Sequence, residues 1–146
     1  MIDSFKEEYA FLSNFYDCPV TYDGLTYRNS EAAFQAQKTE DEEVRKQFTT
    51  LPPNKAKYLG RNVKLREDWE LIKDVIMYGV CKAKFSNEEL KEKLLATGNE
   101  ELIEGTTWHD NYWGNCTCEK CKHIEGKNRL GKTLMAIREE LRDAEE

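Results

Sequence analysis

A chain of 146 residues, 39% hydrophobic and 34% charged, has about the length of one domain with a single core and a strongly charged surface. Its net charge of −6 argues against sequence-independent binding of nucleic acid, which depends on Lys and Arg to neutralise phosphates. No stretch approaches the roughly 20 apolar residues of a membrane span, and residues 1–8 lack the features of a signal peptide, so we expect a cytoplasmic protein with no membrane partner.

The first predicted element is a β-hairpin. Two β-prone runs, Cys18–Tyr22 and Leu25–Arg28, flank Asp23-Gly24, a pair that favours a type I′ turn. Ser30 then has the residue type of a helix N-cap, so we expect a helix over about 31–38.

Four more helices are predicted downstream. An acidic helix begins at 40–43 and ends before Pro52, and a short helix runs from Pro53 to Tyr58 with Gly60 as its stop. The periodicity of apolar residues predicts a longer helix over about 67–84, and Ser86-Asn87-Glu88-Glu89 is a capping box for a helix that ends at Gly98.

The C-terminal third predicts a short strand at 102–103, an irregular stretch at 104–126 and a last helix over about 128–142. Because no βαβ unit repeats, the elements indicate an α+β fold: a mainly helical single domain over 1–146 with a few short antiparallel strands.

One candidate site is the segment 30–38. Its helical spacing places Glu31, Gln35 and Lys38 on one face. The alternative is an ordinary first-turn acid, favourable against the helix dipole, with a Gln and a Lys in water.

A second candidate is the segment 54–66, which holds five cations in an acidic protein: Lys55, Lys57, Arg61, Lys64 and Arg66. Lys point charges and an Arg fork suit a phosphate or diphosphate. The alternative is a solvated helix face.

The third candidate is the irregular segment 104–115, with Trp108, His109, Asp110, Tyr112 and Trp113. Loops rich in such residues on a rigid scaffold are often functional, and aromatic faces can stack on a base. Alternatively, both Trp side chains fill the core and Asp110 caps a helix or turn.

Together these segments resemble the YbiA-like, or NADAR, family. The resemblance is collinear over nearly the whole chain and rests on these residues: Phe11-Leu12-Ser13-Asn14-Phe15, Glu31 with Gln35-Ala36 and Lys38, Lys57 with Gly60-Arg61, Trp69, Met77, Lys84-Phe85, Leu94-Leu95-Ala96-Thr97-Gly98, Leu102 with Glu104, Asp110 with Trp113-Gly114, and Gly126 through Met135 with Arg138.

The resemblance implies an N-glycosidase that needs no cofactor. It implies catalytic roles for Glu31, Asp110 and Lys38, with Lys38 either tuning the carboxylate or attacking the opened sugar as an amine. It also implies a set of substrate-binding residues: Asn14, Lys57, Arg61, Trp69, Trp108, Trp113 and Asn128.

The expected substrate is a small phosphoribosylated aminopyrimidine, an intermediate of riboflavin biosynthesis. One alternative is removal of ADP-ribose from guanine in nucleic acid. Another, from a different class, is a non-catalytic module that binds ADP-ribose or a nucleotide, although carboxylates in the pocket argue against a pure anion binder.

A Cys-rich loop at about 115–125 stands where the family pattern passes from Gly114 to Gly126. Cys116, Cys118 and Cys121 could bind a structural zinc, with His109 or His123 as the fourth ligand. The alternative is a reduced, exposed loop without metal.

Overall fold

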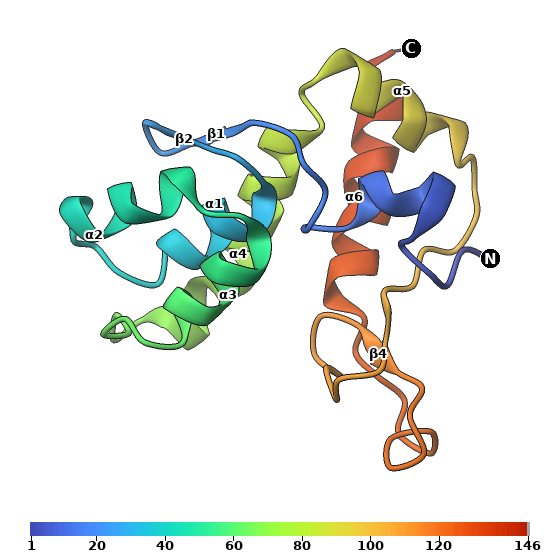
Figure 1. Cartoon of the computed structure of the whole chain (residues 1–146). Helices are drawn as coiled ribbons and strands as arrows, with labels where there is room; N and C mark the ends of the chain where they lie inside the picture. Colours follow the sequence, from blue (N-terminus) through green and yellow to red (C-terminus); the bar gives the residue numbers. More distant parts are fainter. Residues whose placement is uncertain (146) are drawn as a thin grey trace. The chain divides into compact units, whose positions relative to one another are not determined.

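The computed structural model describes residues 1–145, which form two compact units (Figure 1). The continuous unit spans Asn14–Asn87. The discontinuous unit combines Met1–Ser13 with the chain from Glu88 onward. No helix in residues 1–145 is both long and apolar enough for a membrane span.

The continuous unit holds a hairpin and a group of helices: β1 (Val20–Tyr22), β2 (Leu25–Tyr27), α1 (Ser30–Ala36), α2 (Glu42–Gln47), the 3₁₀ helix η2 (Phe48–Thr50), α3 (Pro53–Gly60) and α4 (Trp69–Lys84). The hairpin prediction is confirmed, because β1 and β2 pair antiparallel with Tyr22 opposite Leu25. Asp23 and Gly24 both have positive φ, 49° and 87°, as a type I′ turn requires.

Helix α1 lies at the centre of this unit. All seven of its residues are buried, and it packs against α3 and α4 (Figure 1). Its N-cap is Asn29, not Ser30 as predicted: the Asn29 side chain accepts from the Ala32 N–H at 2.7 Å, whereas the Ser30 hydroxyl donates to the Asn14 side chain. Ser30 is therefore the first helical residue, and it attaches the helix to the preceding loop.

Helix α3 ends at Gly60 as predicted, but the physical reason is not a left-handed glycine cap. Gly60 is the last residue of α3 and does not have a positive φ. It is buried against α1, where a Cβ would lie 2.0 Å from Oε1 of Gln35. A helix-to-helix approach, and not a stop signal, thus requires glycine here.

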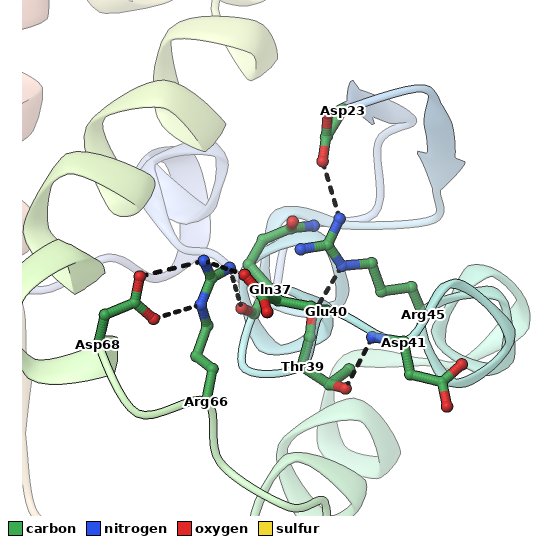
Figure 2. A network of polar contacts seen from close by, with 8 residues as sticks. All are labelled: Asp23, Gln37, Thr39, Glu40, Asp41, Arg45, Arg66 and Asp68. Atoms are coloured by element: carbon green, nitrogen blue, oxygen red, sulfur yellow. Dashed lines mark hydrogen bonds and ion pairs between the residues drawn. The ribbon is translucent and has the colours of Figure 1, made fainter.

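Two arginines brace the loop between α1 and α2 (Figure 2). The Arg45 guanidinium donates to the carbonyl of Thr39 and to the carboxylate of Asp23, in the hairpin turn. Arg66 donates to Asp68, to Glu40 and to the carbonyl of Gln37. Because the loop follows α1 directly, these contacts fix the C-terminal end of that helix.

The discontinuous unit contains the 3₁₀ helix η1 (Glu7–Leu12), α5 (Glu88–Ala96), β3 (Gly105–Thr106), β4 (Asn115–Cys116) and α6 (Arg129–Ala144). Gly98, at φ 65°, ends the α5 segment as predicted. The strand expected at 102–103 is reduced to a single bridge between Ile2 and Leu102. Strands β3 and β4 pair parallel, so the expectation of antiparallel strands alone is wrong. The eight residues between them return the chain to run in the same direction.

Candidate active site

Glu31 lies in the first turn of α1 and is 8% exposed. Its backbone N–H donates to the carbonyl of Asn14 at 3.0 Å, and its Oε1 accepts from Nε2 of Gln35 at 2.9 Å. A carboxylate at a helix N-terminus is stabilised by the helix dipole, and the amide fixes its orientation. The structure therefore holds a largely buried acid in one defined position.

Gln35 also belongs to this site, although its position on the same helical face as Glu31 does not by itself indicate a role. Its Oε1 is buried, and within residues 1–145 it is the buried side-chain atom without a hydrogen-bond partner. An unsatisfied buried oxygen is costly, and such groups occur at sites that bind a ligand or store strain.

Lys38 lies just beyond α1, and its Nζ donates to the carbonyl of Gly60 at 3.5 Å. Burial lowers the pKa of the Lys38 amine, the nearby Glu31 carboxylate raises it, and the positive charges of Arg61 and Lys73 lower it further. Two of the three predicted catalytic residues, Glu31 and Lys38, thus lie close enough to Arg61 to interact electrostatically. Lys73 also lies within this range, although its place one helical turn after Trp69 does not indicate a role from sequence alone.

Trp69 forms a wall of this group. It is 5% exposed, its ring centroid lies 5.1 Å from that of Phe34, and Nζ of Lys38 lies 6.0 Å above it. For a residue predicted to bind substrate, this burial favours lining the pocket over stacking on a base.

The other predicted residues of the continuous unit are Asn14 and Lys57. Asn14 is buried; it accepts from the Ser30 hydroxyl at 2.9 Å and donates to the sulfur of Met77 at 3.4 Å. Its side chain thus anchors the start of α1. Nζ of Lys57 lies 5.9 Å from the half-exposed ring of Phe15.

In the discontinuous unit, Asp110 organises its own loop. One carboxylate oxygen accepts from the N–H groups of Tyr112 (3.0 Å) and Trp113 (2.9 Å), while Thr106 donates its hydroxyl to the Asp110 carbonyl. This is the turn-capping arrangement that the sequence analysis gave as the alternative. The catalytic role of Asp110 stays a prediction.

The aromatic residues of this loop differ in exposure. Trp108 is 50% exposed, and Trp113 is half-buried against Tyr112, with ring centroids 4.8 Å apart in an edge-to-face arrangement. Lys127 and Arg129 lie within 6 Å of the Tyr112 ring, at 5.3 and 5.9 Å. The loop therefore presents aromatic surface beside cations.

Asn128, a predicted substrate ligand, uses its amide inside the protein. At φ 50° it precedes α6, accepts from the N–H of Glu104 at 3.0 Å and donates to the carbonyl of Leu102 at 2.9 Å. A Cβ on Gly131 would lie 2.1 Å from that same carbonyl. Asn128 thus clamps 102–104 onto the start of α6.

The cysteine loop brings four side chains together. His109, Cys116, Cys118 and Cys121 place their nitrogen and sulfur atoms within 4.8 Å of one another. His123, the other candidate ligand, is exposed and lies outside this group. Burial raises the pKa of the Cys116 thiol, but hydrogen bonds from Cys118 and from the His109 backbone outweigh it and bring the pKa to about 6.

A groove of about 840 Å³ also lies on the continuous unit, between residues 39–47 and 59–68. It is lined by Lys64 and Arg66 of the basic segment 54–66, but by none of the residues to which the family resemblance gives a catalytic or substrate-binding role. The groove is open and lined by charges of both signs, so its size alone does not indicate the site of reaction.

Comparisons with known proteins agree with the resemblance. The NADAR domain model matches residues 3–142. N-glycosidase YbiA of Escherichia coli is 40% identical over 142 residues, which cover 94% of this chain and 85% of that protein. A riboflavin biosynthesis protein of Vibrio vulnificus is 37% identical over 94% of this chain, which corresponds to 37% of its own length. The NMR structure of E. coli YbiA superposes with a TM-score of 0.82 at 38% identity, covering 99% of this chain and 89% of that one.

Proposed function

This chain belongs to the NADAR family and is an N-glycosidase, and we propose that its substrate is a phosphoribosylated aminopyrimidine, an intermediate of riboflavin biosynthesis. The observation that carries the proposal is the buried Glu31 carboxylate, held by Gln35 next to Lys38 and Arg61. The name of the Vibrio relative supports the choice of pathway.

Cleavage of a ribose N-glycosidic bond builds positive charge at the anomeric carbon. A carboxylate fixed in a poorly solvated position stabilises that charge more strongly than one in water, because it needs no reorganisation as the charge develops. Glu31 meets both conditions, since it is 8% exposed and bonded to Gln35. We assign this role to Glu31.

The ribose phosphate requires cations. Arg61 and Lys73 lie within electrostatic range of Lys38. Lys57 lies in α3, one helical turn before Arg61, which caps that helix. A guanidinium with neighbouring ammonium groups is a suitable phosphate ligand set. We assign phosphate binding to Lys57, Arg61 and Lys73.

Lys38 has a role as a nucleophile in one version of the mechanism. Its ε-amine adds to C1 of the ring-opened sugar, the amino group of the base leaves as the free amine, and water then releases the sugar from the Schiff base. The lowered pKa of the Lys38 amine supports this version, because a larger fraction of the amine is unprotonated. Reduction with cyanoborohydride during turnover would attach the sugar to Lys38. An absence of adduct, with full turnover, would favour direct attack by water.

The decisive assay offers the phosphoribosylated aminopyrimidines and ADP-ribosylated DNA in parallel and measures the released base. We expect turnover of the small substrates, and a Glu31→Gln loss of about 10²–10³-fold, the range for removing one group that stabilises developing charge. Cleavage of the DNA alone would refute the proposed substrate. An unchanged rate for Glu31→Gln would refute the role of the carboxylate.

Asp110→Asn separates two roles of the loop acid. Asn retains an oxygen that accepts from the N–H groups of Tyr112 and Trp113, but it removes the negative charge. If Asp110 is catalytic, Asp110→Asn keeps the melting temperature and loses activity, while Asp110→Ala loses both. Full activity of Asp110→Asn would leave Asp110 as a turn cap.

A further inference from the structure

We propose that the loop between β3 and α6 binds one structural zinc ion through four side chains: His109, Cys116, Cys118 and Cys121. The ion would hold the loop in place and would take no direct part in the glycosidase reaction.

The distances fit a zinc tetrahedron. With Zn–S bonds of about 2.3 Å and Zn–N bonds of about 2.0–2.1 Å, tetrahedral geometry separates two sulfurs by about 3.8 Å and a nitrogen from a sulfur by about 3.6 Å. Nδ1 of His109 lies 3.3 Å from Sγ of Cys118 and 3.4 Å from Sγ of Cys121. All four ligand atoms lie within 4.8 Å of one another. Movements of a few tenths of an ångström to about one ångström would complete the coordination.

The backbone is arranged to bring these ligands together. Cys116 belongs to β4, and its N–H donates to the side chain of Asn111 at 2.9 Å. The N–H of Cys121 donates to the carbonyl of Cys118 at 3.0 Å, which closes a tight turn between two of the ligands. His109 has a φ of 67°, a conformation that non-glycine residues rarely adopt and that needs a compensating interaction.

The ligand types select the metal and its role. Three thiolates and one imidazole in a tetrahedral arrangement are typical of zinc. Four protein ligands leave no coordination position for water, which distinguishes a structural site from a catalytic one. The ion would join the chain at residues 109, 116–118 and 121, next to a sheet whose strands β3 and β4 have only two residues each. It would therefore supply the cross-link that such a small sheet lacks.

The first test is the metal content of the full chain, purified in a reducing buffer without added zinc or chelator. We expect about one zinc per chain by elemental analysis, as four-ligand sites hold a single ion. We also expect cobalt(II), added after zinc removal, to give the intense absorption of tetrahedral cobalt–thiolate. A reduced protein that contains no zinc, takes up none and gives no cobalt spectrum overturns the proposal.

Matched variants identify the ligands. His109→Ala is compared with His123→Ala, and Cys118→Ala with Cys18→Ala, a buried thiol of the other unit. We expect His109→Ala and Cys118→Ala to weaken zinc binding by more than about tenfold, the loss that even outer-shell changes can produce. His123→Ala and Cys18→Ala should retain wild-type affinity. Loss of zinc in His123→Ala and not in His109→Ala would overturn the ligand assignment.

Two further measurements use only the wild-type protein and therefore test the zinc site even if a variant folds poorly. Trypsin should cut wild-type protein after Lys120 and Lys122 at least about tenfold faster once zinc is removed, because binding suppresses opening of the loop. Thiol titration of the denatured protein should find all five cysteines reduced. A disulfide within the loop in freshly purified protein, or cleavage unaffected by zinc, would contradict a zinc cross-link.

Discussion

Gly60→Ala tests the contact that positions the proposed catalytic acid. The new Cβ would lie 2.0 Å from Oε1 and 2.7 Å from Cδ of Gln35, so the Gln35 side chain must rotate away. The rotation breaks its 2.9 Å hydrogen bond to Glu31, which costs about 1.5–3 kcal/mol for a bond to a charged group. Alanine in place of glycine in a helix returns about 1 kcal/mol. The expected net destabilisation is about 0.5–2 kcal/mol.

The same substitution in a Gln35→Ala background tests whether the Gln35 amide causes the clash. There the clashing amide is gone and only Cβ of residue 35, at 3.2 Å, stays close, so Gly60→Ala should be near neutral and clearly less destabilising than in the wild type. Urea unfolding of the four proteins gives the coupling energy, and initial rates give the effect on catalysis. We expect both single variants to lose activity to a similar extent, with the double variant no worse. Equal destabilisation by Gly60→Ala in both backgrounds would refute the proposed contact.

Two pairs of substitutions, one in the Asp23–Arg45 ion pair and one in α6, should differ clearly in their effect on the free energy of unfolding. Asp23→Asn should change the unfolding free energy by less than about 1 kcal/mol, because the Asp23 carboxylate is 64% exposed and Asn suits the positive φ of the turn. Arg45→Ala should cost about 1–3 kcal/mol, because the Thr39 carbonyl loses the donor that Figure 2 shows. Equal effects of Asp23→Asn and Arg45→Ala in chemical denaturation would contradict this. Gly131→Ala should cost about 3 kcal/mol, at the upper end of overpacking, because its Cβ would meet a backbone carbonyl that cannot rotate away. Ala136→Gly on the exposed side of the same helix should cost only about 1 kcal/mol, and a thermal melt in which it is the worse of the two would exclude the clash.

Local signals in the sequence were sufficient for the hairpin and for most helices. Asp23-Gly24 predicts its turn because the required positive φ values depend on those two residues alone. The choice between Asn29 and Ser30 as N-cap could not be made locally, since both residue types cap helices and Ser30 is diverted by Asn14, 16 residues away. The end of α3 at Gly60 is predicted locally, but the need for glycine there is not, because the atom that requires it, Oε1 of Gln35, lies on another helix.

The candidate site likewise combines residues that the sequence indicates with residues whose role depends on contacts between distant parts of the chain. The family pattern selected Glu31 and Lys38, and the structure brings them together with Arg61. The family pattern contains Gln35 without giving it a role, and it does not contain Lys73. The importance of both depends on which atoms meet across α1, α3 and α4. Similarly, spacing alone could not choose between His109 and His123, because only the folded loop shows that His109 reaches the thiols.

The order of elements along the chain has a consequence for synthesis on the ribosome. The continuous unit, Asn14–Asn87, can complete its contacts as soon as it emerges. Residues 1–13 belong to the discontinuous unit, so Ile2 has no partner until Leu102 has been made. At about 5–20 residues per second, translating residues 14–87 alone takes about 4–15 s. During that interval Ile2, Phe5, Phe11 and Leu12, all buried in the finished protein, are apolar side chains to which a nascent-chain chaperone can bind.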